Sequence, residues 1–546
     1  MKRVLVTAAA AVASLSLSGP ADAARYAVGL ARGADVEAVA EAVEQRAGSR
    51  PERLGRIPAL VVEARSRHAL EGIPGVRYVE RLAVRQLALT PTDPLVQKQW
   101  YLTQSRFYEP WITLPALEPV PVAVIDSGVN AAHPELAGKI LGSKSFVGEP
   151  ASLDTLGHGT FVAGLIAAGV GNGIGIAGLA PSAELLVAKV VTKSRTISVE
   201  AEARAVHWAV ENGARVVNMS LGGLRDPLDP SRDTYSRLEA DAIAYAVSNG
   251  VVVVAAVGNS DPGAASPWRY ASYPAALPHV LGVSAVAEDG SVPTFSNRDP
   301  IYNDLAAPGE QILSIFPRPL TARYPACAEQ GYSSCGPEEY REAQGTSFAA
   351  PQVTAAAAVL LSLDPTLRPE QVTAILRGTA VDHTPATGCV GCTVGRDALS
   401  GWGRLDVSRA IRALSEPLPL RDRYEANDDA GPRAYELFGS TRRIDATVDF
   451  WDDQDDVYAI RLRRGQPVYV GLKGPETGVD LSLAFWLPGT RSIQDVSTVQ
   501  RRARVSARPG ARQYLSYRAD LAGTYFVQVR MSSAGLARYR LTVVKA

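Results

Sequence analysis

The chain has 546 residues, of which 56 are basic and 56 acidic, so its formal net charge is zero. That balance argues against a nucleic acid or an anionic membrane surface as partner. Hydrophobic residues make up 46% and charged residues 21%, which is typical of a globular protein, and this length predicts about two to four domains. No internal stretch approaches ~18 uncharged apolar residues, so we expect no membrane-spanning helix.

Residues 1–23 have the pattern of an export signal. A positive pair, Lys2-Arg3, precedes the apolar run 4–17, and Ala21-Asp22-Ala23 is a small-residue cleavage site. The charged start and the small-residue end argue against the alternative, a buried helix. We expect an exported protein, extracellular or periplasmic, whose mature chain or precursor begins near Ala24.

Residues 24–88 predict a compact α+β unit. The run 26–30 is typical of a strand, the spacing of apolar residues over 35–47 predicts a helix, and 60–63 and 76–79 predict further strands. The unit is either a permanent small domain or a segment that is later removed.

Three segments that each contain glycine hold the candidate catalytic residues. The apolar run PVAVI leads straight into Asp126, which predicts a buried parallel strand with a carboxylate at its end. His158 lies in GHGTFVAG, before an apolar helical run. Ser347 lies in QGTSFAAP, before an alanine-rich run that predicts a helix over 349–363. Ser347 is therefore expected near a helix N-terminus, where free N–H groups favour negative charge.

These residue types suit acyl transfer. A serine hydroxyl needs an adjacent base, a histidine can take and return its proton, and an aspartate can fix the imidazole tautomer. The order Asp126, His158, Ser347 is that of the subtilisin triad. Taken singly, they could be a strand-end turn residue, a core histidine and a packing turn. The chain has 6 histidines, and no other lies in a Gly-His-Gly setting.

Together these segments resemble the subtilisin-like serine proteases (subtilases, family S8), and the resemblance covers about residues 92–410. It implies that Asn259, at the end of VVVVAAVGN, donates its side-chain N–H to the oxyanion. The segment NMSLGG resembles the strand edge along which subtilases bind extended peptides. By the same likeness the substrate-binding residues are Ser220, Leu221, Gly222, Ala256 and Ser272.

The resemblance implies a serine endopeptidase that acts on proteins or peptides, needs no cofactor for catalysis and is a monomer. Small, uncharged pocket walls predict large apolar P1 residues. Two other protein classes share part of this pattern. A pseudoprotease that binds peptide without cutting is disfavoured because all four site residues are intact. A carboxyl serine protease of the sedolisin type would need acidic residues in place of His158 and Asn259.

A structural Ca²⁺ is a further implication of the resemblance. The segment GNGIGI is similar to a calcium-binding loop of the family, with Asn172 giving a side-chain oxygen and Ile174 and Ile176 giving backbone carbonyls. Glu135 stands where the family usually has aspartate. The alternative is a plain glycine-rich turn.

Export makes the 4 cysteines interpretable as disulfides. Cys327 and Cys335 bracket a short loop, and Cys389 and Cys392 bracket two residues, so we predict the pairs 327–335 and 389–392. Metal binding is the alternative, but no second Cys-x-x-Cys and no nearby histidine pair support it.

Alternating strands and helices over 92–410 predict a doubly wound parallel sheet, with strands expected at 122–125, 185–191, 216–219, 251–257 and 280–286. Residues 411–425 are interpreted as a linker. Residues 426–546 predict a small β-sandwich that resembles the bacterial pre-peptidase C-terminal domain. It contains a cluster of four acidic residues, Asp452, Asp453, Asp455 and Asp456. These residues either bind Ca²⁺ or form a solvated loop.

The 24–88 unit resembles the inhibitor-like propeptide of secreted subtilases. That likeness implies a folding aid and an inhibitor of the protease that follows. A large parallel sheet with non-local contacts folds slowly, which makes a detachable folding template physically reasonable.

Overall fold

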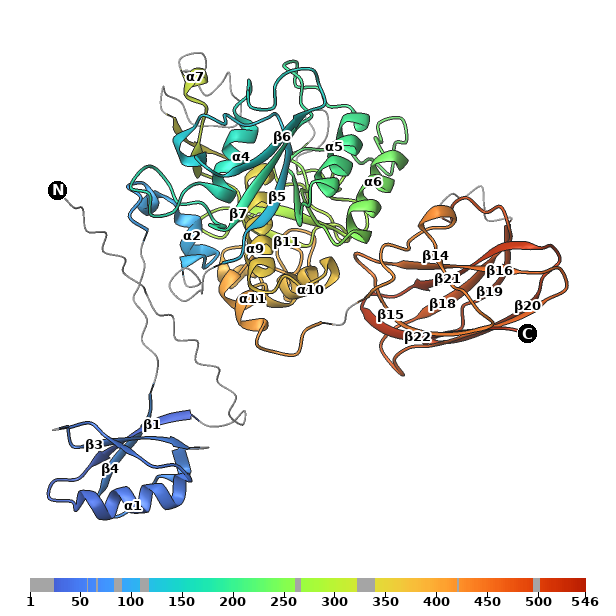
Figure 1. The fold of residues 1–546 in the computed structure, drawn as a ribbon. Coiled ribbons are helices and arrows are strands. Elements are labelled where there is room, and N and C mark those ends of the chain that lie inside the picture. Colours follow the sequence, from blue (N-terminus) through green and yellow to red (C-terminus); the bar gives the residue numbers. More distant parts are fainter. Residues whose placement is uncertain are drawn as a thin grey trace, which may run out of the picture. The chain divides into compact units, whose positions relative to one another are not determined.

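A computed structural model describes residues 24–55, 57–64, 67–82, 91–108, 117–260, 267–321, 339–419, 422–493 and 501–546. The predicted export signal and the predicted Cys327–Cys335 pair lie outside these ranges. The chain divides into two compact units, 1–88 and 89–546, which are described separately (Figure 1).

The first unit has an antiparallel sheet in the order β2-β3-β1-β4 and one helix. The helix, α1 (Val36–Ala47), begins where Asp35 accepts hydrogen bonds from two backbone N–H groups of the first turn. Val39 and Val43 on its buried face pack on the sheet core, as the apolar spacing predicts. The strands are β1 (Ala24–Leu30), β2 (Glu52–Arg53), β3 (Ala59–Ala64) and β4 (Val76–Arg81).

The second unit is built on a seven-stranded parallel sheet in the order β11-β10-β9-β8-β5-β7-β6. The α/β fold predicted from the sequence is confirmed, and all five expected strands are present. β6 and β11 were not expected. β6 has a weak apolar pattern because none of its residues is fully buried. The strands are β5 (Val120–Asp126), β6 (Ile140–Ser145), β7 (Ala183–Lys189), β8 (Val216–Met219), β9 (Val252–Ala256), β10 (Val280–Val286) and β11 (Leu305–Pro308).

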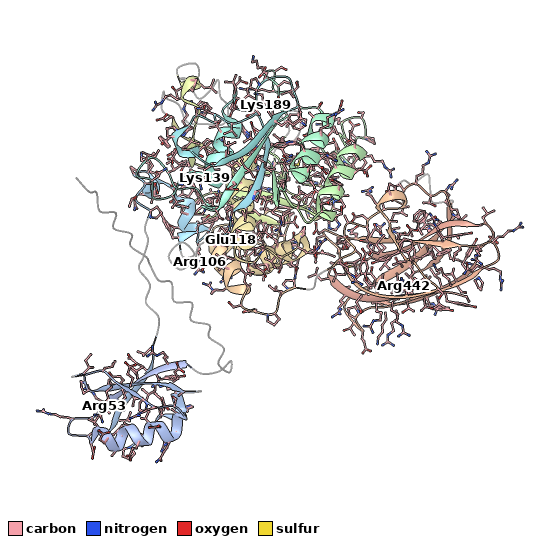
Figure 2. The ribbon with its side chains drawn as sticks, viewed as in Figure 1. Arg53, Arg106, Glu118, Lys139, Lys189 and Arg442 are labelled. Atoms are coloured by element: carbon pink, nitrogen blue, oxygen red, sulfur yellow. A yellow bond between two sulfur atoms is a disulfide. The ribbon has the colours of Figure 1, made fainter. Side chains whose placement is uncertain are left out.

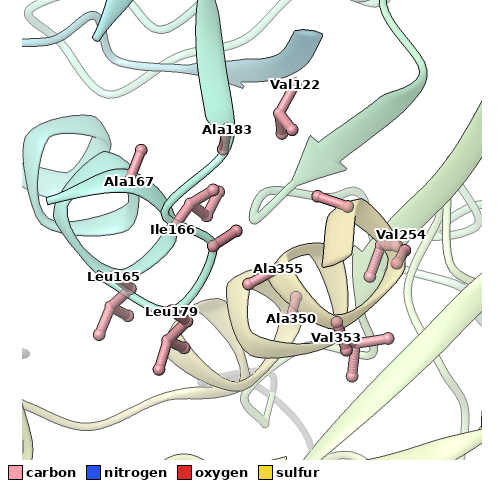
Figure 3. Packing of buried hydrophobic residues seen from close by; sticks show 14 of the residues in the cluster. Val122, Leu165, Ile166, Ala167, Leu179, Ala183, Val254, Ala350, Val353 and Ala355 are labelled. Carbon is pink, nitrogen blue, oxygen red and sulfur yellow. The ribbon is translucent and has the colours of Figure 1, made fainter. Parts of the chain in front are cut away.

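Successive residues of the central strand β5 enter two different cores. Val122 and Val124 pack in one core with helices α4 (His158–Ala167) and α9 (Thr346–Leu363) (Figure 3). Ala123 and Ile125 pack in the other, with α5 (Val199–Glu211) and α6 (Arg237–Ser248). Both faces of the sheet are covered, which is why its strands are continuous apolar runs.

Helix α9 crosses the centre of the first core. It is long and apolar enough to span a membrane, but 89% of that stretch is buried inside the protein, so it serves here as a core helix. It begins three residues before the predicted 349–363, at Thr346, after Gly345 with φ of 147°. That backbone conformation is one that side chains other than glycine rarely adopt.

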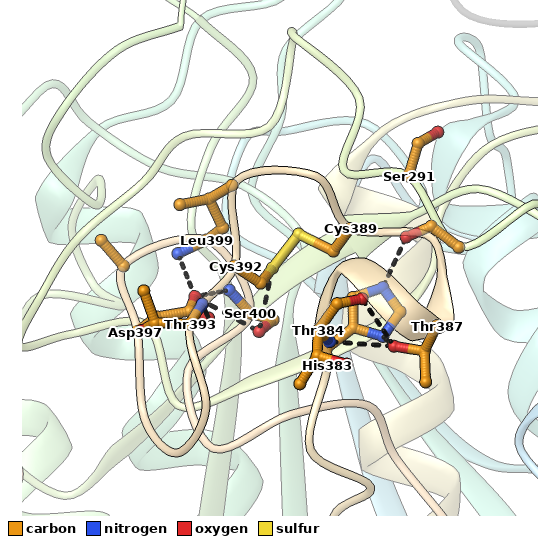
Figure 4. The surroundings of a disulfide bond; sticks show 12 residues. Ser291, His383, Thr384, Thr387, Cys389, Cys392, Thr393, Asp397, Leu399 and Ser400 are labelled. Carbon is orange, nitrogen blue, oxygen red and sulfur yellow. Dashed lines mark hydrogen bonds between the residues drawn. A yellow bond between two sulfur atoms is a disulfide. The ribbon is translucent and has the colours of Figure 1, made fainter.

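Smaller elements complete the catalytic fold. Strands β12 (Ile312–Ile315) and β13 (Tyr340–Ala343) pair antiparallel. The disulfide between Cys389 and Cys392 is present as predicted and lies beside Ser400 (Figure 4). Among the described residues, the remaining α-helices of this unit are α2 (Trp100–Gln104), α7 (Arg318–Thr321), α10 (Pro369–Thr379) and α11 (Val407–Ala413).

The C-terminal region is a sandwich of a five-stranded sheet, β14-β16-β21-β18-β19, and a four-stranded sheet, β15-β22-β17-β20. Aromatic and aliphatic side chains from both sheets form one core. The strands are β14 (Tyr435–Glu436), β15 (Thr441–Asp449), β16 (Asp455–Leu462), β17 (Pro467–Lys473), β18 (Leu481–Trp486), β19 (Arg502–Ser506), β20 (Arg512–Arg518), β21 (Gly523–Met531) and β22 (Leu536–Lys545).

Two expectations for this region are corrected. The interpretation of the acidic residues as a solvated loop is wrong, because Asp453 and Asp455 are each 7% exposed and Asp456 is 0% exposed. The segment 411–425 is also not a free linker throughout. Its first residues complete α11, and Asp422 and Glu425 are buried.

Candidate active site

Asp126 and His158 come together at the carboxyl end of the central sheet. Asp126 is the last residue of β5, and His158 is the first of α4. The Nδ1 atom of His158 lies 2.8 and 2.9 Å from the two carboxylate oxygens of Asp126. A side chain at Gly159 would collide with the carbonyl of Gly128 at 2.1 Å, so glycine after the histidine permits this close approach.

A second carboxylate, Asp154, holds the two segments in register. It is 2% exposed and accepts hydrogen bonds from the backbone N–H groups of Leu156, Gly157 and Thr160 and from the Thr160 hydroxyl. It also accepts the hydroxyl of Ser127, 2.9 Å away, and that hydroxyl in turn accepts the N–H of Gly159. The β5 end and the α4 start are thereby tied together.

Burial and nearby carboxylates act in opposite directions on the pKa of His158. Burial by itself lowers the pKa of His158, but the charge of Asp126, its hydrogen bond and the charge of Asp154 raise it, and the net pKa is raised. Burial raises the pKa of Asp154, against the lowering effect of its hydrogen bonds. An ionised Asp126 facing Nδ1 fixes the imidazole with its Nε2 available for proton exchange.

Ser347 is the second residue of α9 and is half-buried. Its hydroxyl donates to the carbonyl of Ser220 at 3.2 Å, and the Ser220 hydroxyl donates back to the carbonyl of Ser347 at 2.8 Å. The start of α9 is therefore attached to the segment that follows β8. Phe348, the next residue, packs against the His158 ring with a centroid distance of 5.5 Å.

Asn259 is held with its amide in one orientation. Its Oδ1 accepts the backbone N–H of Thr346 at 2.8 Å and the Thr346 hydroxyl at 2.9 Å. A backbone N–H can only donate, so the oxygen must face Thr346, and the amide nitrogen then faces away from it. That nitrogen would lie 3.3 Å from a side-chain carbon added at Gly345. Asn259 as a whole is exposed, and its amide nitrogen lies near the Ser347 turn.

The sequence-predicted pocket residues gather around two glycines. A side-chain carbon at Gly222 would meet the carbonyl of Tyr273 at 2.3 Å, and one at Gly258 would meet the Ser272 hydroxyl at 2.4 Å. Ser272 also accepts a hydrogen bond from Asn297 at 3.4 Å. Ser220 and Ala256 are buried, Leu221 is half-buried and Gly222 is exposed.

Comparison with known proteins identifies the chain's family. The family model described as "Subtilase family" matches residues 118–403, more than half of the chain. The chain belongs to the subtilase family. Its relatives include Subtilisin DY of Bacillus licheniformis, 36% identical over 264 residues, which are 48% of this chain and 84% of the relative. Subtilisin Savinase of Lederbergia lenta is 37% identical over 294 residues, 54% of this chain and 91% of the relative.

A third relative, the alkaline protease of Shouchella clausii, is 33% identical over 365 residues, 64% of this chain and 83% of the relative. This subtilase is thus a serine endopeptidase that hydrolyses proteins, with a doubly wound parallel sheet, and subtilases need no cofactor for catalysis. The family predicted from the sequence is confirmed, and the comparisons lend no support to the pseudoprotease alternative.

In the loop predicted to hold Ca²⁺, N–H donors already contact the side-chain oxygens. Glu135 Oε1 accepts the N–H of Ile176 and its Oε2 accepts the Asn172 amide, each at 2.8 Å. Asn172 Oδ1 accepts the N–H of Ile174 at 2.9 Å. Asp93, which the sequence did not single out, accepts two more N–H groups of the loop. These contacts fit a hydrogen-bonded turn. Calcium binding here stays a prediction, and it would require the N–H donors to move away from these oxygens.

Asp154 and Lys189 support the site but were missed from the sequence. Lys189 ends β7 and is completely buried (Figure 2). Its ammonium donates to the carbonyl of Leu153 at 2.8 Å and lies 3.4 Å from Glu149, which holds the loop that carries Asp154. A lysine at the end of an apolar strand is an unusual pattern, and it could have pointed to Lys189 as a buried structural residue.

Proposed function

We propose that this subtilase is an exported endopeptidase, made as a precursor, in which Asp126, His158 and Ser347 form the catalytic triad. The observation that carries the proposal is the contact of His158 Nδ1 with both carboxylate oxygens of Asp126, at 2.8 and 2.9 Å. It is supported by the position of Ser347 at the start of α9, beside the segment that follows β8.

In the proposed reaction, the Ser347 hydroxyl exchanges its present acceptor, the carbonyl of Ser220, for Nε2 of His158. The hydroxyl oxygen attacks the carbonyl carbon of a peptide bond while its proton passes to Nε2. Asp126 stays ionised and stabilises the imidazolium. The proton is then given to the leaving amine, and the resulting acyl-enzyme is hydrolysed by water activated through the same histidine.

The oxyanion would be held by the Asn259 amide N–H and the backbone N–H of Ser347. This assignment is supported by the fixed Asn259 amide, whose oxygen is already engaged by Thr346. A preorganised donor acts on charge that develops only in the transition state, and losing one such donor typically costs about 10²–10³ in turnover.

The proposed substrate strand runs along Ser220, Leu221 and Gly222, with the P1 side chain entering toward Ala256 and Ser272. Both glycines that flank this place leave no room for a side chain of their own. We expect large apolar P1 residues because the walls carry no charge, although the Ser272 hydroxyl leaves a polar point at the base. Cleavage profiling with a peptide library measures this, and a strict preference for basic P1 residues would refute it.

Export, processing and accessory roles belong to the same proposal. Export rests on the signal-like residues 1–23. The separate α+β unit within 24–88 suits a removable inhibitor and folding aid, and the sandwich within 426–546 suits an accessory domain. Mass spectrometry of the active species recovered outside the cytoplasm tests all three, because it gives both ends of the mature chain.

The triad assignment is tested with Ser347→Ala and His158→Ala. We expect Ser347→Ala to abolish casein hydrolysis and self-processing, and His158→Ala to abolish labelling of Ser347 by a sulfonyl fluoride. Matched controls are Ser231→Ala and His207→Ala, which change an exposed turn and an exposed helix residue. Casein hydrolysis by Ser347→Ala at the control rate would refute the assignment.

A further inference from the structure

Basic side chains are concentrated at the C-terminal end of a chain that is neutral as a whole. Residues 461–546 contain 15 basic and 4 acidic side chains, whereas the complete chain has 56 of each. Such a charge asymmetry is typical of a part that meets an anionic partner. These residues supply β17 to β22 of the sandwich, and the pairing of those strands decides where the charges lie.

The four-stranded sheet of the sandwich carries an excess of cations on its outer side. Along its strands, residues that enter the core alternate with residues that face outward, and we call the outward residues the basic face. Its charged members are six cations and two carboxylates, namely Arg443, Lys473, Arg512, Arg518, Arg538, Arg540, Asp445 and Asp449. Both carboxylates are already paired, because Asp445 lies 2.9 Å from Arg540 and Asp449 lies 3.0 Å from Arg377.

Three cations of the basic face lie side by side across neighbouring strands. Lys473 of β17 is the direct cross-strand partner of Arg540 in β22 on one side and of Arg512 in β20 on the other. Like charges directly opposite one another destabilise a sheet. Protection of an edge strand from aggregation would account for Arg512. It does not account for Arg540 and Lys473, because β22 and β17 are interior strands. A ligand that supplies negative charge does account for the row.

The row is open to solvent and only weakly neutralised. The side chains of Arg540 and Arg512 are 57% and 63% exposed, and Lys473 is exposed as well. Arg540 pairs with Asp445, and Arg512 pairs with Glu476, whose side chain is 80% exposed. Exposed pairs of this kind contribute about 0–1 kcal/mol, so both arginines can turn to a ligand at little cost.

The basic face also has the extent and the aromatic side chains that suit a chain-like ligand. Its row spans two strand spacings, about 10 Å, and Arg512 and Arg518 lie about 20 Å apart along β20. Tyr514 is the cross-strand partner of Gly471, and Tyr469 precedes that glycine by two residues. The two tyrosines are 61% and 42% exposed, and a side-chain carbon at Gly471 would meet no atom within 4 Å. Open space therefore lies over the sheet between tyrosines and cations.

We propose that the basic face binds an anionic polysaccharide, a chain of sugars that carries carboxylate or sulfate groups. The row around Lys473 holds the anionic groups, and the rings of Tyr469 and Tyr514 pack on the sugar rings while their hydroxyls remain free to hydrogen-bond. An anionic membrane would favour aliphatic side chains around the cations, whereas the outward neighbours of Gly471 are Tyr514 and Thr542. The choice of a polysaccharide over a nucleic acid rests on the proposed export.

Titration with three polysaccharides tests the proposal. The full chain with Ser347→Ala, which prevents self-digestion, is titrated with heparin, with polygalacturonate and with uncharged dextran. We expect the two polyanions to bind, dextran not to bind, and the affinity to fall about tenfold as salt rises from about 50 to 200 mM. Binding of heparin alone would assign sulfate as the recognised group, and binding of polygalacturonate alone would assign carboxylate. Binding of neither, or equal binding of dextran, would overturn the proposal.

Lys473→Glu provides the sharpest variant. The new carboxylate lies between Arg540 and Arg512, so the fold should be kept and the Tm should not decrease. The affinity for the polyanions should nevertheless fall about tenfold or more, because two units of charge are lost. The control is Lys98→Glu, which makes the same change at an exposed lysine of the catalytic fold and should bind like the parent. Equal losses in both variants would assign the binding to net charge and refute the face.

Tyr514→Ser separates a polysaccharide from other polyanions, and it decides the matter if Lys473→Glu does not fold. Loss of the ring should weaken polygalacturonate or heparin binding about fivefold, because stacking on the sugar is lost. Double-stranded DNA and phosphatidylglycerol vesicles are the comparison ligands. Tighter binding of either one than of both polysaccharides, or an unchanged polysaccharide affinity in Tyr514→Ser, would contradict the proposal. None of these measurements depends on catalysis, so a negative result leaves the proposed triad untouched.

Discussion

Two of the places where this subtilase buries carboxylates have different surroundings. Beside the active site, Asp154 accepts five hydrogen bonds from N–H and hydroxyl donors. At the junction between the catalytic fold and the sandwich, Glu425 and Asp456 each keep a buried oxygen with no donor among the described residues. A satisfied carboxylate rigidifies a site, whereas an unsatisfied one calls for a counter-charge. Burial alone therefore does not say what a carboxylate does.

Asp126→Asn gives the largest expected effect. The amide keeps the shape but cannot stabilise an imidazolium or hold the correct tautomer, so we expect kcat to fall by about 10⁴. The acid limb of kcat/KM should also move to lower pH, because the carboxylate that raises the pKa of His158 is gone. A variant with unchanged kcat would show that Asp126 is not the orienting carboxylate.

Arg377→Met tests the charged contact next to the junction. Arg377 is 8% exposed and pairs with Asp304 of the catalytic fold and with Asp449 and Asp452 of the sandwich. Removing the guanidinium leaves three buried carboxylates without their positive partner. We therefore expect a loss of about 3–5 kcal/mol in unfolding free energy. Urea unfolding of the inhibited protein measures it.

The matched control for this change is Arg461→Met, whose side chain is 80% exposed and 3.6 Å from Glu436. An exposed pair contributes about 0–1 kcal/mol, so the control should unfold almost like the parent. Equal losses in the two variants would contradict the view that burial at the junction sets the strength of these contacts.

Asp154→Asn addresses the satisfied carboxylate. The amide has one acceptor oxygen in place of two, so at least one buried N–H loses its partner, and we expect a loss of about 1–3 kcal/mol in stability. Because Asp154 positions the start of α4, kcat should fall about tenfold with KM little changed. A change confined to thermal stability would make its role purely structural.

The sequence singled out the residues of the proposed triad but not the residues that support them. Asp126, His158 and Ser347 each lie within two residues of a glycine and next to an apolar run, a pattern that is visible in the sequence. Asp154 stands in the polar segment ASLDTL, where nothing local distinguishes it from a solvated aspartate. Its partners come from Ser127 and from the first turn of α4, so only the tertiary structure shows its function.

The same limit applied to the junction. Asp453, Asp455 and Asp456 look locally like part of a solvated loop, and only their burial in the folded chain reverses that interpretation. Buried carboxylates inside helices were equally invisible. Glu202 of α5 and Glu239 of α6 fall on helix surfaces that pack against one another and become 6% and 4% exposed.

That helix pair supplies the smallest predicted effect, and one of opposite sign. Burial raises the pKa of Glu202 to about 7, and burial together with Glu202 raises the pKa of Glu239 to about 8. The pKa of this carboxyl is 4.5 in the unfolded chain and higher in the folded chain. The protonated carboxyl therefore favours the folded state, and this contribution is lost when the carboxyl ionises. Stability should therefore decline as pH rises from about 4.5 to 8.

Glu239→Gln removes that ionisation. We expect it to be nearly neutral at pH 5 and to raise the Tm of the inhibited enzyme at pH 9, where the parent must ionise a buried carboxyl. The control is Glu200→Gln on α5, whose carboxylate is exposed and pairs with Arg204 at 2.8 Å. A rise in Tm of the same size at pH 5 and pH 9 would have to come from packing. Glutamine cannot ionise, so an effect of the Glu239 charge must differ between the two pH values.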